Sequence, residues 1–145
     1  MNAALRALAE RLRGEDTPIA GHVVEVPGDA GAEEPDEYEF VIEAVREGYL
    51  LHYGESRLIA GHDRDLALLA GDYLYALGLD RLAALGDTEA VAVLSELIGR
   101  CAQLHAEGRE EEVEALWVEA ERRITLAAAA GRPSLRPARG RSASG

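Results

Sequence analysis

The acidic side chains that could hold a metal ion lie along one apolar stretch of the chain. Asp65, Asp72 and Asp80 recur at intervals of seven and eight residues within residues 63–85, so on a helix they would form one narrow stripe. Carboxylate oxygens are the ligands that magnesium prefers, and Asp65, Asp72 and Glu55 form one hypothetical magnesium site. The same spacing is typical of a solvent-facing seam on an otherwise buried helix, and we favour that interpretation.

A second pair of metal-binding side chains lies near the end of a later segment. Cys101 and His105 are four residues apart, and with His52 or His62 they would provide zinc ligands. However, a cysteine on an apolar helical stripe and a histidine at a helix end are more often structural. We therefore expect neither a metal ion nor another cofactor.

Composition and charge narrow the class of protein and its partners. A chain of 145 residues with 48% hydrophobic residues suffices for one globular domain. The formal net charge of -12 argues against binding to nucleic acid, and no segment favours stable membrane insertion. The single cysteine and the absence of an apolar leader predict a cytoplasmic protein. All positive side chains are arginine, which is typical of a bacterial gene of high GC content.

Apolar periodicity and local composition divide the chain into four parts. An acidic, proline-rich and glycine-rich stretch separates the first helix from the others, and we expect it to be flexible. Within it, residues 22–26 leave a short strand open as an alternative. The predicted parts are an N-terminal helix at 1–13, an acidic flexible linker at 14–35, a helical domain at 36–130 and a disordered Arg/Pro/Ser tail at 131–145.

Caps and apolar stripes predict an all-α fold, a small bundle of about four to five helices. Gly71 and Gly78 lie seven residues apart, where they would let a neighbouring helix approach closely. Within the helical domain, the predicted helices run from Asp36 to about Tyr53, from 63 to 85, from 88 to 106 and from 109 to about 129.

Three short segments follow one another along the middle of the chain: Leu69-Ala70-Gly71-Asp72-Tyr73-Leu74, Leu85-Gly86-Asp87-Thr88-Glu89-Ala90-Val91 and Leu94-Ser95-Glu96-Leu97-Ile98. In this order they resemble the middle of the trans-isoprenyl (polyprenyl) diphosphate synthases. The resemblance implies an isoprenoid-synthase-like fragment. In that family an Asp-Asp-x-x-Asp motif holds magnesium, but here the corresponding stretch reads Leu50-Leu51-His52-Tyr53-Gly54-Glu55, and the second Asp-rich motif is missing as well. The resemblance therefore implies a relative that lacks the family's metal-binding motifs.

Together these patterns predict a non-catalytic helical protein that acts as an interaction or regulatory subunit. Its partner would be a prenyl diphosphate synthase or a second copy of itself. Two alternatives stay open: binding of an isoprenoid or other apolar ligand, and a residual magnesium-dependent prenyltransferase activity. We assign no catalytic residue, and the candidate ligand or interface residues are Tyr49, His52, Tyr53, Gly71, Asp72, Tyr73 and Tyr75.

Overall fold

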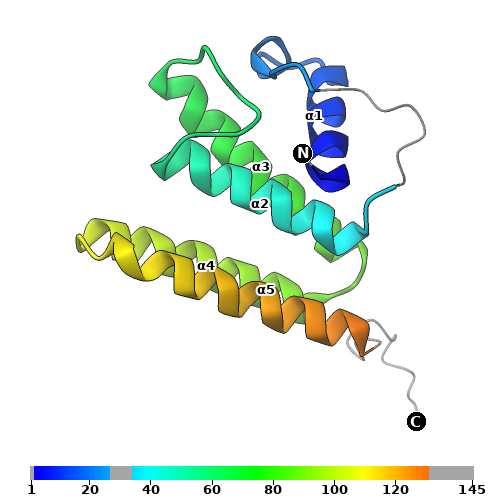
Figure 1. The fold of residues 1–145 in the computed structure, drawn as a ribbon, viewed down its shortest axis with the longest axis vertical. Helices are drawn as coiled ribbons and strands as arrows, with labels where there is room; N and C mark the ends of the chain where they lie inside the picture. The colour runs from blue at the N-terminus through cyan, green and yellow to red at the C-terminus, as the bar shows by residue number, and fades with distance from the viewer. Residues whose placement is uncertain (1, 27–33, 131–145) are drawn as a thin grey trace. The chain divides into compact units, whose positions relative to one another are not determined.

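Helices make up most of the computed structural model, which describes residues 2–26 and 34–130. Within these ranges the chain forms five α-helices, two short 3-10 helices and one isolated β-bridge, which confirms the predicted all-α fold class. The predicted tail at 131–145 lies outside the described residues. The α-helices are α1 (Ala3–Gly14), α2 (Glu37–Tyr53), α3 (Arg64–Ala84), α4 (Thr88–Ala106) and α5 (Val113–Ala129), and the 3-10 helices are η1 (Ala20–His22) and η2 (Glu110–Glu112) (Figure 1).

The helix ends follow from capping residues that the sequence shows directly. Asp36, Asp63 and Asp87 each accept backbone N–H groups of the first turn that follows, at distances of 2.8 to 3.3 Å. Gly86 and Gly108 follow α3 and α4 with φ values of 77° and 73°, the left-handed conformation that ends helices. The predicted starts and ends of these helices are therefore confirmed to within a few residues.

The chain divides into two compact units, Met1–Gly78 and Leu79–Gly145. The first unit contains α1, α2 and most of α3, and the second contains the end of α3 together with α4 and α5. The boundary falls within the stretch that the sequence groups as one helical domain. No helix in the described ranges is long and apolar enough to cross a membrane.

An apolar core fills the first unit. α1 packs on α2 and turns Leu5, Leu8 and Leu12 inward, as its periodicity predicts. The core continues through α2 and α3, and its other large members are Ile19, Phe40, Leu51, Leu58, Ile59, Leu74 and Leu77.

Residues 15–26 are not the flexible linker that their acidic composition suggests. Ile19 is buried in the core, and Val23 forms an antiparallel bridge with Ile59 in the connection between α2 and α3. Two backbone hydrogen bonds of 2.7 and 2.9 Å flank this bridge. Composition fails here because a few apolar residues suffice to anchor a polar segment to a core. The sequence left a short strand at residues 22–26 open as an alternative. At these residues the structure shows a single isolated bridge and no named strand.

α2 and α3 approach so closely that glycine is needed on both. A Cβ atom at Gly48 would lie 2.7 Å from the Tyr75 ring and 2.9 Å from the carbonyl oxygen of Gly71. A Cβ atom at Gly78 would lie 2.6 Å from the side chain of Val45. The close helix contact predicted for Gly71 and Gly78 is therefore confirmed, and Gly48 belongs to the same contact.

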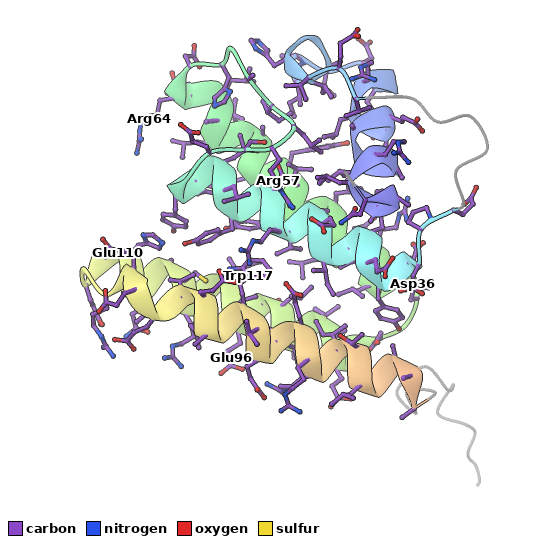
Figure 2. The ribbon with its side chains drawn as sticks, in the orientation of Figure 1. Asp36, Arg57, Arg64, Glu96, Glu110 and Trp117 are labelled. Atoms are coloured by element: carbon purple, nitrogen blue, oxygen red, sulfur yellow. The ribbon has the colours of Figure 1, made fainter. Side chains whose placement is uncertain are left out.

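The second unit is built on an antiparallel pair, α4 and α5, which lie side by side (Figure 1). Glu110, at the turn between them, begins the short 3-10 helix that precedes α5 (Figure 2). Cys101 and Trp117 are buried on the stripes that the sequence predicts. The other buried side chains of this pair are Ala90, Val93, Leu94, Leu97, Leu104, Val113, Ala120 and Ile124.

Glycine substitutions on α2 and α4 should have opposite effects on stability. Gly48→Ala should lower the free energy of unfolding by about 1 to 3 kcal/mol, because its methyl group meets a carbonyl oxygen that cannot rotate away. Gly99→Ala is the matched control, since its methyl group would meet nothing within 4 Å, and it should stabilise α4 by up to about 1 kcal/mol. Thermal unfolding followed by circular dichroism measures both, and equal shifts would contradict the close α2–α3 contact.

Candidate functional site

Most of the predicted site residues gather where α2 crosses α3. The imidazole of His52 stacks on the ring of Tyr75, with centroids 5.3 Å apart and planes 12° apart. Tyr53 lies 5.8 Å from His52 and 5.2 Å from Tyr49, measured between ring centroids. We call these residues the α2–α3 aromatic cluster, and its members are Tyr49, His52, Tyr53, Gly71, Asp72 and Tyr75.

His52 holds the cluster together, and Gly71 provides the space for it. Nε2 of His52 lies 3.0 Å from Oδ1 of Asp72. A Cβ atom at Gly71 would lie 2.7 Å from the imidazole of His52. The His52 side chain is only 16% exposed, whereas that of Asp72 is 73% exposed. Asp72 thus reaches from the solvent-facing seam of α3 to a ring of α2. Asp65 and Asp80 are exposed too, as the seam interpretation predicts.

Tyr73 does not join the aromatic cluster. Its hydroxyl donates a hydrogen bond to Glu15, which follows α1, so the ring points to the opposite side of α3. Burial raises the pKa of Tyr73, and the hydrogen bond to Glu15 and the charge of Glu15 raise it further. Arg11 donates to the same carboxylate at 3.0 Å. Tyr73 therefore ties α3 to the end of α1, a packing role that the sequence did not reveal.

A buried carboxylate at Glu47 is the polar feature that the sequence analysis missed. Glu47 is 0% exposed, and it accepts hydrogen bonds from Ser56 Oγ at 2.5 Å, from the backbone N–H of Arg57 at 2.9 Å and from Arg57 Nε at 2.5 Å. Ser56 Oγ in turn accepts the backbone N–H groups of the next residues, Leu58 and Ile59. This network fastens the connection between α2 and α3 to α2.

Arg57 completes this network at its exposed edge. The residue, labelled beside α2 in Figure 2, also donates to Glu43 at 2.6 Å. Burial lowers the pKa of Arg57, but hydrogen bonds to Glu47 and the charges of Glu47 and Glu43 outweigh that effect and raise it. A signal for this network was present in the sequence: Glu43 and Glu47 lie one helical turn apart on α2, and Ser56-Arg57 follows in the connection.

The second unit carries a shallow groove between α4 and α5. One part, of about 110 Å³, has an apolar floor formed by Val93, Leu97, Leu116 and Ala120. A neighbouring hollow of about 350 Å³ shares Val93 with it and extends to Leu126. We call both together the α4–α5 groove. Its charged lining residues are Glu89, Glu96, Arg100, Glu119, Arg122 and Arg123, three of each sign.

Within residues 2–26 and 34–130, no three His, Cys, Asp or Glu side chains lie close enough together to hold a metal ion. Cys101 is buried on the apolar stripe of α4.

Comparison with protein-family models, with curated proteins and with solved structures finds no match to this chain. The resemblance to prenyl diphosphate synthases accordingly stays a prediction from short segments.

Removal of the buried carboxylate should unfold the protein more easily. Glu47→Ala leaves Ser56 and Arg57 without their acceptor, and we expect a loss of about 3 kcal/mol, the lower end for a buried ion pair, because Arg57 is 40% exposed. The control Glu55→Ala changes an exposed carboxylate in the same connection and should shift stability by less than about 0.5 kcal/mol. Thermal unfolding compares the two variants, and similar midpoints would contradict the structural role of Glu47.

Tyr73 should ionise at higher pH than an ordinary tyrosine. Because its folded-state pKa is raised above 10.0, the stability that its interactions provide is present below pH 10 and is lost as pH rises through the folded-state value. In a titration of tyrosinate absorbance, Tyr73→Phe should remove a late-ionising component. Its absence from the wild-type curve would contradict the Tyr73–Glu15 contact.

Proposed function

We propose that this protein is a non-catalytic helical interaction module that binds a partner protein through the α4–α5 groove. The observation that carries the proposal is the groove itself, which combines an apolar floor with a rim of balanced charge. Protein interfaces commonly have this composition, an apolar centre surrounded by polar and charged residues.

An exposed apolar side chain on α5 supports the same assignment. Leu126 lines the groove and is 58% exposed. Single exposed apolar residues are ordinary on protein surfaces, but Leu126 adjoins an apolar groove that a partner could fill. Burial of Leu126 against a partner would contribute hydrophobic stabilisation.

The shape of the groove favours a helical partner segment. It follows two antiparallel helices, so a third helix laid along it would pack its side chains between the ridges of α4 and α5. The sequence resemblance makes a prenyl diphosphate synthase one partner to test, and the chain would then act as a regulatory subunit.

The α2–α3 aromatic cluster supports a structural role more than a catalytic one. Asp72, a carboxylate of the hypothetical magnesium site, bonds to His52, and the same imidazole is stacked between α2 and α3. These contacts hold the helix crossing together, and the groove in the second unit is then the better candidate for binding.

Affinity capture with groove variants tests the proposal. Leu126→Glu places a charge beside the apolar floor and should reduce captured partner protein at least tenfold (about 1.4 kcal/mol). Leu69→Glu, which changes a similarly exposed leucine on α3, is the matched control and should capture as wild type does. The tagged protein serves as bait in extract of its native host, with untagged copies of the chain added. Equal recovery with both variants would refute binding through the groove.

The non-catalytic part of the proposal has its own measurement. The purified protein, mixed with magnesium, isopentenyl diphosphate and an allylic primer, should form no longer prenyl diphosphate. Product formation that Asp72→Asn abolishes would overturn this part and restore the prenyltransferase alternative.

A further inference from the structure

We infer that the partner in the α4–α5 groove is the same groove of a second copy, so that two hairpins form a four-helix bundle. This inference rests on the proposed function, since it names the occupant of the same site. Two features of the second unit carry it: the charge of the groove and the order of its charges.

The groove is electrically neutral on an acidic protein. Its three Glu and three Arg side chains cancel, whereas the whole chain has a formal net charge of -12. Two copies repel each other through most of their surface, and a neutral surface is where that repulsion is weakest. A cationic partner would instead be attracted to acidic surface, which this groove does not offer.

The order of the rim charges is self-complementary. Along α4, Glu96 comes before Arg100, and along α5, Glu119 comes before Arg123. Because the two helices are antiparallel, one end of the rim carries Glu96 and Arg123, and the other end carries Arg100 and Glu119.

Two-fold symmetry then places opposite charges face to face. If the axis runs along the groove, α4 meets the α5 of the second copy, and Glu96 faces Arg123 while Arg100 faces Glu119. If the axis runs across the groove, α4 meets the α4 of the second copy, and Glu96 faces Arg100. Either arrangement places Glu96 and Glu119 opposite an arginine of the second copy, as an isologous contact requires. Glu119 also pairs with Arg122 of its own helix at 2.8 Å.

The size of the hairpin face is sufficient for a reversible dimer. α4 has 19 residues and α5 has 17, so the hairpin is about 26 Å long and, at about 10 Å per helix, about 20 Å wide. Such a face amounts to about 500 Å² per copy, or about 1,000 Å² in total, the lower limit for a specific interface. We therefore expect a weak, reversible dimer.

Two rim variants with opposite charge test the inference. The acidic variant carries Arg100→Glu and Arg123→Glu, and the basic variant carries Glu96→Arg and Glu119→Arg. Each alone presents like charges to its own copy and should dimerise at least tenfold more weakly than wild type in sedimentation equilibrium. An equimolar mixture of the two should restore a one-to-one dimer. Arg64→Glu, a charge change on α3, is the control and should dimerise as wild type does.

The outcomes separate this inference from the proposed function. A wild-type chain that stays monomeric up to millimolar concentration would overturn the inference, as would variants that dimerise normally alone or fail to pair when mixed. If Leu126→Glu still lost a different captured protein, the groove would bind another partner, and the proposed function would stand without the dimer. Circular dichroism of each variant shows whether the helices are retained, so that a failure of two folded variants to pair counts against the inference.

Discussion

The first unit depends on the near-contact of two backbones where α2 crosses α3. The Cβ position of Gly48 lies 2.9 Å from the carbonyl oxygen of Gly71, so any side chain at Gly48 would force the helices apart. The stacking of His52 on Tyr75 requires this short separation, and so does the burial of the core residues between the two helices. Small residues at a crossing thus determine which larger side chains can meet beside it.

The connection between α2 and α3 is ordered by one buried carboxylate. Glu47 receives three hydrogen bonds from Ser56 and Arg57, and these bonds hold the connection beside α2. Held there, Ile59 can pair with Val23, and the acidic segment after α1 gains a bridge to the core. A buried charge is costly unless it is fully hydrogen-bonded, and here the bonds also position a segment that has few apolar residues of its own.

The second unit offers a different kind of surface from the rest of this acidic chain. Its groove joins apolar floor residues to equal numbers of positive and negative side chains, and it includes the exposed Leu126. In the aromatic cluster of the first unit, the imidazole of His52 bonds to Asp72 and stacks on Tyr75. For these reasons we propose the second unit as the binding region, and a structural role for the cluster that the sequence analysis had put forward.

The sequence by itself determined the helices, because capping and periodicity are local: Asp36, Asp87 and Gly86 are read from neighbouring residues. It also indicated the close approach at Gly71. Only the tertiary structure decided that Glu47 is buried, that Tyr73 turns toward Glu15 and that Ile19 orders a segment of linker-like composition. Each of these depends on partners distant in the chain, and no local pattern specifies which distant residues a fold brings together.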